Sequence, residues 1–406
     1  MEDANNSYDL IIIGGGPAGL SAAIYGGRAK LKTLLINKGT LGGMADTTRE
    51  IVNYPGTIKV SGPDLMGDFA KHAESFGVEF LKDEVVGTDF AGERKKVTTK
   101  KKKEFFAKAV IIAVGNEPRL LDIPGEKELQ GSGVAYCATC DAEFFEGEDV
   151  VVIGSGDQAI EEGMYIAKFA RKVTVIVLHD EGILDCNKVS AEGALRHEKM
   201  EFVWNSTIEE VLGEESVEGV KIRNIKTGEL TEFPCQGVFF FVGMIPSTQF
   251  LKASRLEMDK RGYIPVSEQM ETNLEGVYAV GDNRSKYLRQ VVTAASDGAT
   301  AAVAAERYIE EQDSFQLKVL QSEKKVLLLF FDAFNHESLE FSTSLEEVNL
   351  ELPESYKIVK IDMATKKNLA HKYQIDKVPS VVLLEKGLEI KRLNCCTGKD
   401  KLKSQL

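Results

Sequence analysis

The stretch Tyr8-Asp-Leu-Ile-Ile-Ile-Gly14-Gly-Gly16-Pro-Ala-Gly19 joins an apolar run to three spaced glycines, and an Ala-rich segment over residues 20–29 follows it. The apolar run predicts a buried strand, the Ala-rich segment a helix and residues 33–36 the next strand, which together form a βαβ unit. In such a unit the first glycine permits the tight turn, the second lets the backbone approach a pyrophosphate, and the third lets helix and strand pack closely. The sequence therefore predicts a dinucleotide-binding turn, and Asn37 stands where an acidic residue usually binds the ribose.

A second unit of this kind begins with the apolar run Val150–Ile153. The turn Gly154-Ser-Gly156-Asp-Gln-Ala159 follows, then a helix is expected to about residue 170 and a strand over residues 173–177. A site for NADPH needs a cation after that strand to bind the 2′-phosphate. The sequence has Leu178-His-Asp-Glu181 there, so the unit has the shape for a nucleotide but is poorly equipped for NADPH. A vestigial site that holds nothing remains an alternative.

The run Cys137-Ala-Thr-Cys140-Asp141 is the expected reactive centre. The Cys-x-x-Cys spacing brings two sulfurs close enough to cycle between dithiol and disulfide, and Asp141 can shuttle a proton to the leaving thiolate. A metal site is not expected, because there is no second Cys-x-x-Cys pair and no two histidines have a metal-ligand spacing. We therefore assign Cys137, Cys140 and Asp141 as the catalytic residues.

Composition narrows the class of protein. The 406 residues include 50 Lys+Arg and 63 Asp+Glu, which gives a formal net charge of −13. Such an acidic chain argues against nucleic-acid binding and against a basic membrane-surface protein, and no apolar run approaches the ~20 residues of a membrane-spanning helix. The polar N-terminus lacks the features of a signal peptide, so a cytoplasmic protein is expected.

Over roughly residues 8–311 the chain resembles the low-molecular-weight thioredoxin reductases, which are flavoprotein disulfide reductases. Further motifs occur in family order and at family spacing: Asn53-Tyr-Pro-Gly56, Ala113-Val-Gly-Asn-Glu-Pro-Arg119, Gly276-Val-Tyr-Ala-Val-Gly-Asp282 and Arg289-Gln-Val291. The resemblance implies an α/β fold with two Rossmann-like domains: an FAD domain from residues 1–117 and 247–312, and an inserted nucleotide-binding domain, 118–246, with the redox cysteines. Family members are homodimers whose inserted domain rotates, so a homodimer is expected here.

The resemblance also implies the site residues. Cys140 is expected to face the flavin, and the cysteine pair to pass electrons to a disulfide of a thioredoxin-like protein. The residues expected to bind FAD are Gly14, Gly16, Pro17, Ala18, Gly19, Asn37, Gly43, Met44, Asn53, Ala113, Gly115, Gly281, Asp282, Arg289, Gln290 and Val291. The residues expected at the second nucleotide site are Gly154, Gly156, Asp157, Gln158, Ala159 and His179.

Two departures from the family bear on the electron donor. Members that use NADPH carry a His-Arg-Arg run and a further Arg, where this chain has Val177-Leu-His179 and Ile183, and Met44 replaces a Gln that contacts the flavin. We therefore expect a donor other than NADPH, either a second FAD in the inserted domain or ferredoxin, for which the lysines at 95–96 and 100–103 offer a docking patch. NADH is an alternative donor, and a non-catalytic flavin-binding redox sensor or scaffold is the alternative from another class.

After an expected linker, 313–324, residues 325–406 resemble a thioredoxin fold. The Cys-Gly-Pro-Cys of a working thioredoxin aligns with Asn335-His-Glu-Ser338, so this domain lacks the redox pair. We expect a docking or dimer-stabilising module. The adjacent Cys395 and Cys396 are expected to be two ordinary thiols near the end of its last strand.

Overall fold

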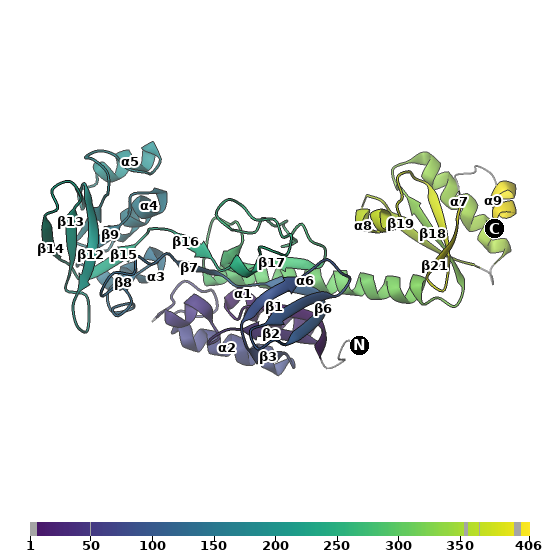
Figure 1. Cartoon of the computed structure of the whole chain (residues 1–406), viewed down its shortest axis with the longest axis horizontal. Coiled ribbons are helices and arrows are strands. Elements are labelled where there is room, and N and C mark those ends of the chain that lie inside the picture. Colours follow the sequence, from purple (N-terminus) through teal and green to yellow (C-terminus); the bar gives the residue numbers. More distant parts are fainter. Residues whose placement is uncertain (1–5, 49, 353–355, 365, 394–398) are drawn as a thin grey trace. The chain divides into compact units, whose positions relative to one another are not determined.

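The structure is a computed structural model that describes residues 6–48, 50–352, 356–364, 366–393 and 399–406. The chain divides into two compact units, Met1–Glu306 and Arg307–Leu406 (Figure 1). Among the described residues, none of the helices is long and apolar enough to span a membrane. Cys395 and Cys396 lie outside the described residues.

The first sheet of the first unit has the strand order β3-β2-β1-β6-β5-β4, and β17 pairs with β6. The neighbours β3, β2, β1, β6 and β17 are parallel, whereas β4 and β5 form antiparallel pairs. Residues Leu10–Ile13 of β1 are almost completely buried, because a parallel sheet is covered on both faces. The strands are β1 (Ser7–Ile13), β2 (Thr33–Asn37), β3 (Glu79–Lys82), β4 (Val85–Asp89), β5 (Lys95–Thr99), β6 (Glu104–Ile112) and β17 (Val277–Ala279). The helices and 3-10 turns around this sheet are α1 (Pro17–Arg28), η2 (Gly43–Thr47), α2 (Gly62–Ser75), η5 (Gly281–Asn283) and α6 (Val291–Phe315).

The inserted segment leaves and rejoins this domain through β7 and β16, which pair antiparallel. It contains a parallel sheet of order β11-β10-β9-β15-β8 and an antiparallel sheet β12-β13-β14. The turn that carries Cys137 and Cys140, called the redox turn below, follows β8 and leads into α3. The second glycine turn, residues 154–159, follows β9 and leads into α4. The strands are β7 (Asn116–Pro118), β8 (Val134–Ala135), β9 (Asp149–Ile153), β10 (Lys172–Ile176), β11 (Met200–Val203), β12 (Ser206–Leu212), β13 (Gly219–Asn224), β14 (Leu230–Pro234), β15 (Gly237–Phe240) and β16 (Met244–Pro246). The helices are α3 (Ala138–Asp141), η3 (Ala142–Phe145), α4 (Asp157–Ile166) and α5 (Lys188–Leu195), and η4 (Gln249–Leu251) follows β16.

The segment expected as a linker differs from the prediction. Helix α6 continues to Phe315, and a π-helical turn covers Gln316–Leu320, so most of residues 313–324 are helical. The physical reason is apolar burial, since Phe315, Val319 and Leu320 pack into a core of the second unit. The helix therefore does not end where the linker was expected to begin. Beyond residue 312 it packs within the second unit.

The second unit is built on a mixed sheet of order β19-β18-β20-β21. Its elements are β18 (Lys325–Phe331), α7 (His336–Glu351), β19 (Tyr356–Asp362), α8 (Lys367–Lys372), β20 (Ser380–Glu385), β21 (Leu388–Leu393) and α9 (Lys399–Gln405). The Val378–Pro379 bond, which precedes β20, is cis. Two apolar clusters sandwich the sheet, one of them around Phe330 and the other around Leu329.

The lysine-rich hairpin is only partly solvated. Strands β5 and β6 form a hairpin that carries the lysines expected to form a docking patch. Lys95 is buried, however, and its ammonium donates to the carbonyls of Phe90 and Gly92 at 3.3 and 2.9 Å. Burial lowers the pKa of Lys95. The exposed basic group is therefore confined to the turn at residues 100–103.

Candidate functional site

The first glycine turn has the geometry that a dinucleotide needs. Gly14 adopts a φ of +109°, and a Cβ there would lie 2.3 Å from the carbonyl oxygen of Ala113. A Cβ at Gly19 would lie 1.9 Å from the carbonyl oxygen of Gly14, so helix α1 packs directly on the turn. At Gly16, in contrast, an added Cβ would meet only the Gly42 carbonyl, at 3.9 Å. Pro17 begins α1 behind this open backbone, and Ala18 is buried beside it.

The amide of Asn37 stabilises the turn. Its Oδ1 accepts from the Gly15 N–H at 3.0 Å, and its Nδ2 donates to the carbonyls of Gly39 and Thr40 at 3.2 and 2.7 Å. The amide is thus bonded to protein on both sides, whereas the sequence suggested a contact with a ribose. Gly43, at the start of η2, lies against the Gly16 backbone, and the exposed Met44 follows it.

The carboxyl end of β6 meets the turn η5. The Ala113 N–H donates to the Ile13 carbonyl at 2.8 Å, and the Gly115 N–H donates to Oδ1 of Asn283 at 3.3 Å. These bonds bring the predicted residues Ala113 and Gly115 beside the predicted residues Gly281 and Asp282. Segments far apart in the sequence therefore meet at one edge of the sheet.

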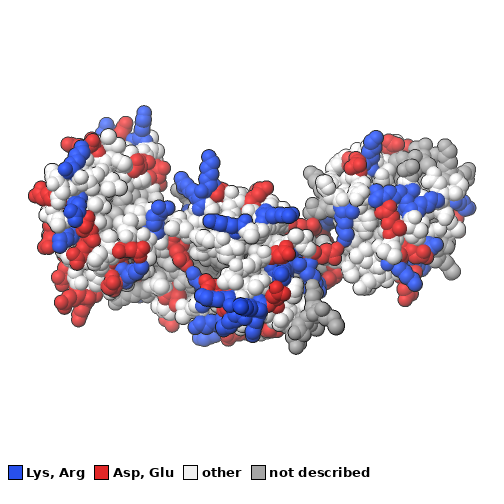
Figure 2. All heavy atoms as spheres, in the orientation of Figure 1, with Lys and Arg blue, Asp and Glu red and all other residues white. Residues whose placement is uncertain are grey.

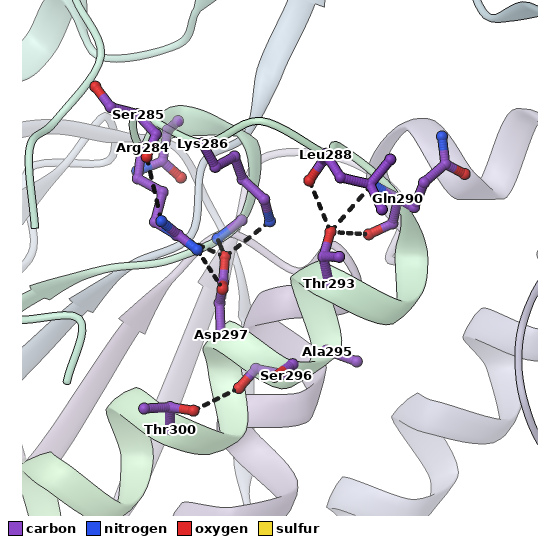
Figure 3. Close-up of polar contacts among 12 residues, drawn as sticks. Arg284, Ser285, Lys286, Leu288, Gln290, Thr293, Ala295, Ser296, Asp297 and Thr300 are labelled. Carbon is purple, nitrogen blue, oxygen red and sulfur yellow. Dashed lines mark hydrogen bonds and ion pairs between the residues drawn. The ribbon is translucent and has the colours of Figure 1, made fainter. Parts of the chain in front are cut away.

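A buried ion cluster fixes the segment between Gly281 and Val291 (Figure 3). The Asp297 carboxylate accepts from the Gly281 N–H at 3.0 Å, from Arg284 through Nε and a terminal nitrogen, both at 2.8 Å, and from Lys286 at 2.9 Å. Burial alone would raise the pKa of Asp297, but the bonds from Arg284 and Lys286 outweigh it and hold the pKa below its ordinary value. Asp297, Arg284 and Lys286 were missed in the sequence analysis, because their pairing is a tertiary contact that a single sequence does not display.

Two polar atoms beside this cluster fit an absent cofactor. Asp282 Oδ1 and Arg289 Nε are buried and have no hydrogen-bond partner within the described part of the chain. Burial raises the pKa of Asp282, and the guanidinium of Arg289 lies 4.7 Å from the ring centre of Tyr263. Since buried polar groups are normally paired, these atoms are suited to bind the hydroxyls and ring edges of an FAD that the glycine turn would hold by its pyrophosphate.

The redox turn lies against the start of α6. Cys137 and Cys140 form a disulfide with a Cα–Cα distance of 5.3 Å. Gln290 Nε2 donates to Thr139 Oγ1, between the two cysteines, at 2.8 Å, and Asn53 Nδ2 donates to Gln290 Oε1 at 3.1 Å. The structure thus brings together the disulfide and two residues predicted to bind FAD.

Asp141 closes the short helix that carries the cysteines. Burial raises its pKa to about 6, from an ordinary value of 3.8. A carboxyl group that titrates near neutral pH can both give and take a proton, which suits the exchange of dithiol and disulfide. Among the described residues, no group of three His, Cys, Asp or Glu side chains is placed to bind a metal.

The second glycine turn repeats the first, but acidic side chains are bonded around it. Gly154 approaches the Phe241 carbonyl, Gly156 is open and Ala159 is fully buried, as in a nucleotide-binding turn. Asp157, the first residue of α4, accepts from the backbone and side chain of Asn187 at 2.7 and 3.0 Å, and Gln158 is exposed.

The loop after β10 carries the remaining charges of this site. Asp185 Oδ2 accepts from Ser155 Oγ at 3.0 Å and lies 2.7 Å from Nε2 of His179. The contact with His179 lowers the pKa of Asp185. Asp180 is paired with Lys226, from the β13–β14 turn, and this pairing lowers the pKa of Asp180. Among the described residues at this turn, the His179 ring and the Lys226 ammonium are therefore each engaged by a carboxylate, which the sequence alone did not indicate for Lys226.

Comparison with known proteins matches both units. The model of the pyridine nucleotide-disulphide oxidoreductase family matches residues 8–298, and the thioredoxin model matches residues 307–406. A thioredoxin reductase of Peptoclostridium litorale is 50% identical over 313 residues, covering 75% of this chain and 98% of the relative. A bifunctional thioredoxin reductase/thioredoxin of Mycobacterium leprae is 34% identical and covers 97% of this chain and 94% of its own length.

Solved structures agree with these relatives. The crystal structure of thioredoxin reductase from Streptococcus pyogenes is 40% identical with a TM-score of 0.72, and covers 76% of this chain and all of its own. The thioredoxin reductase family binds FAD. Asp282 Oδ1 and Arg289 Nε, which are unpaired within the described residues, and the open backbone at Gly16 fit this cofactor. The chain belongs to the pyridine nucleotide-disulphide oxidoreductase family, as a thioredoxin reductase-like flavoprotein disulfide oxidoreductase with a C-terminal thioredoxin domain.

Proposed function

We propose that this enzyme reduces a protein disulfide with Cys137 and Cys140 and takes its electrons from a donor other than NADPH. The observation that carries the proposal is the turn after β10, where a 2′-phosphate would need a free cation. His179 and Lys226 are bonded there to Asp185 and Asp180. A phosphate at this turn would have to compete with both carboxylates.

The chemistry uses the chain's own side chains. FAD, when bound, supplies the exchange of two electrons with the donor. The Cys137–Cys140 disulfide accepts two electrons and two protons and becomes a dithiol, and Asp141 gives or takes the proton beside Cys140. A thiolate of the pair then attacks the disulfide of a thioredoxin-like partner, and the second cysteine resolves the mixed disulfide.

A second FAD in the inserted domain is one donor that the geometry supports. Gly156 leaves the backbone of the turn open, and an added Cβ would meet nothing within 4 Å. A pyrophosphate can bind to backbone N–H groups at such a turn without arginines. The side chains of Asp157 and Asp185 bond to Asn187 and Ser155, and the backbone of Asp185 forms a β-bridge with Gly156 on one side of the turn.

Ferredoxin is the other donor, and a basic surface supports it. Lys38 follows β2, Lys82 ends β3, and the turn of residues 100–103 is bonded to the β3–β4 connection. Figure 2 shows basic side chains gathered over the part of the first unit where β2 and β3 lie. An acidic protein would be repelled by a chain of net charge −13 except at such a surface.

The first test is the flavin-to-chain ratio of the purified protein, measured by denaturing release. A ratio near two supports a flavin as the donor in the inserted domain, and a ratio near one supports a diffusing donor. In the latter case reduced ferredoxin should bleach the flavin, and Lys101→Glu with Lys103→Glu should slow this reaction at low salt. Lys252→Glu with Lys260→Glu, at two exposed lysines outside this turn, is the charge-matched control.

A gain-of-function variant tests the carrying observation. Leu178→Arg with His179→Arg should confer flavin reduction by NADPH, because it supplies two cations at the turn and removes the bond of His179 to Asp185. Leu178→Gln with His179→Gln removes that bond without adding charge and should not. Rapid reduction of the unaltered chain by NADPH would overturn the proposal.

Two alternatives have distinct outcomes. NADH remains possible in chemical terms because Asp180 and the exposed Glu181 could accept from a ribose diol. Reduction by NADH at a ratio of one flavin per chain would favour it. A redox sensor or scaffold would bind FAD yet fail to turn over any dithiol acceptor, even with artificial donors.

A further inference from the structure

A second carboxylate lies beside the redox turn, at the backbone N–H groups between the two cysteines. Glu162 of α4 accepts from the Ala138 N–H through Oε2 at 3.1 Å, and the Thr139 N–H also bonds it. Burial raises the pKa of Glu162, and those two backbone bonds oppose the rise. The two amides belong to the residues between the cysteines, and the Ala138 N–H is part of the peptide bond that joins Ala138 to Cys137.

The surroundings hold this carboxylate in place. Ala138 is fully buried, and it shares an apolar cluster with Ala159 and Ile160 of α4. The neighbouring Glu161 points elsewhere, since it accepts from Ser190 Oγ on α5 at 3.3 Å. Glu162 is therefore bound to the redox turn while the adjacent glutamate is not.

We propose that Glu162 is a positioning residue that keeps Cys137 protonated in the reduced pair, by holding the turn through the Ala138 N–H and by placing a negative charge at the peptide group that follows Cys137. A thiolate at Cys137 would form near the negative charge of Glu162. It also could not accept hydrogen bonds from the Ala138 and Thr139 N–H groups, because these already donate to Glu162. Like charges at short range disfavour one another's ionised form. The two sulfurs thus have different carboxylates, Asp141 at Cys140 and Glu162 at Cys137.

The consequence concerns the protons of the redox step. When the S–S bond breaks, the two electrons from the flavin go to the two sulfurs, which take up two protons if both become thiols and one if a thiolate remains. With Glu162 ionised, the two-proton reaction should extend to higher pH. The inference rests on the family's disulfide chemistry and not on the identity of the electron donor.

Other charged groups on the elements packed around Glu162 do not reverse this field. The field of Glu161 also disfavours ionisation of Glu162, and Asp141 ends the same short helix. The remaining groups are Glu143 on η3, Lys188 and Glu192 on α5, all exposed, Asp149 on β9, bonded to Arg171, and Lys172 on β10, paired with Glu201.

The test is the pH dependence of Cys137 alkylation in the reduced, FAD-loaded full chain, read by peptide mass spectrometry with iodoacetamide. Glu162→Gln keeps an oxygen for the Ala138 N–H but removes the charge. It should lower the pKa of Cys137 by about one unit, which is about a tenfold faster alkylation below that pKa. The pH at which the disulfide midpoint potential loses the proton contributed by Cys137 should fall by the same amount.

Glu161→Gln is the matched control and should leave both profiles unchanged. An unchanged profile in Glu162→Gln, or an equal shift in both variants, would overturn the proposal. The unaltered chain gives an independent measurement that needs no variant. Its Cys137 should titrate above the ordinary thiol pKa of about 8.5, and a lower value would contradict the inference.

Discussion

Replacing Asp141 with asparagine should stabilise the oxidised chain, and the gain should grow with pH. Burial raises the pKa of Asp141 to about 6 from 3.8, so the folded chain binds this proton more tightly than the unfolded chain. The stability that the group contributes is complete below the unfolded pKa and is lost as the pH rises through the folded pKa. A shift of about two units corresponds to ~3 kcal/mol at pH 8 and to about half of that at pH 5.

Trp204 offers a local probe for this measurement. It is the single tryptophan of the chain and packs against the apolar cluster that contains Ala138 and Ala142. Urea unfolding followed by its fluorescence at pH 5 and pH 8 should give a larger stabilisation of Asp141→Asn at the higher pH. Glu146→Gln, an exposed carboxylate in the same segment, is the control. A stabilisation equal at the two pH values, or a destabilised variant at pH 8, would refute the assignment of a buried, costly charge.

Three further predictions concern the FAD site and the cysteine pair. Gly16→Ala should fold normally, because its Cβ meets only the Gly42 carbonyl at 3.9 Å. It should bind FAD roughly tenfold more weakly, because the methyl group blocks the approach of a pyrophosphate. Thermal melting measures the first effect and flavin titration the second. Asp297→Asn should destabilise the first unit by roughly 3–5 kcal/mol in urea unfolding, because it leaves two buried cations without a charged partner; a loss below ~1 kcal/mol would contradict this. Cys137→Ser should show the long-wavelength absorbance of a thiolate beside FAD, and Cys140→Ser should lack it; the same band in Cys140→Ser would mean that Cys140 is not next to the flavin.

Sequence patterns predicted the parts of the fold that repeat a local rule. The two glycine turns were found because each requirement, a tight turn, an open backbone and a close helix, falls on one residue at fixed spacing, as at Gly14, Gly16 and Gly19. The end of α6 was not found, because the helix exchanges one set of apolar partners for another. The helix propensity of the residues does not change where the helix passes from one apolar core to the next. The position of the helix end is therefore visible only from the tertiary packing around Phe315.

The site was predicted less completely than the fold. Resemblance supplied Asp282, Arg289 and Gln290, but not Asp297, whose role depends on two cations that lie 11 and 13 residues before it. Glu162 and Lys226 were missed for the same reason, since each acts across elements that only the tertiary structure brings together. Residues that contact a ligand belong to recognisable sequence motifs. The residues that position them act through tertiary contacts, which a single sequence does not display.

In the C-terminal thioredoxin domain, Asn335 and Ser338 stabilise the start of a helix. Asn335 caps α7, since its Oδ1 accepts from the Ser338 N–H at 3.0 Å. Ser338 is fully buried. The resemblance to thioredoxin aligns both residues with the cysteines of a working thioredoxin, so this position is expected to hold a helix cap where a dithiol would be. We therefore expect electrons that leave Cys137 and Cys140 not to enter the fused domain at this position. We therefore predict that the disulfide acceptor is a separate thioredoxin-like protein, which would be reduced by the full chain even when residues 335–338 are altered.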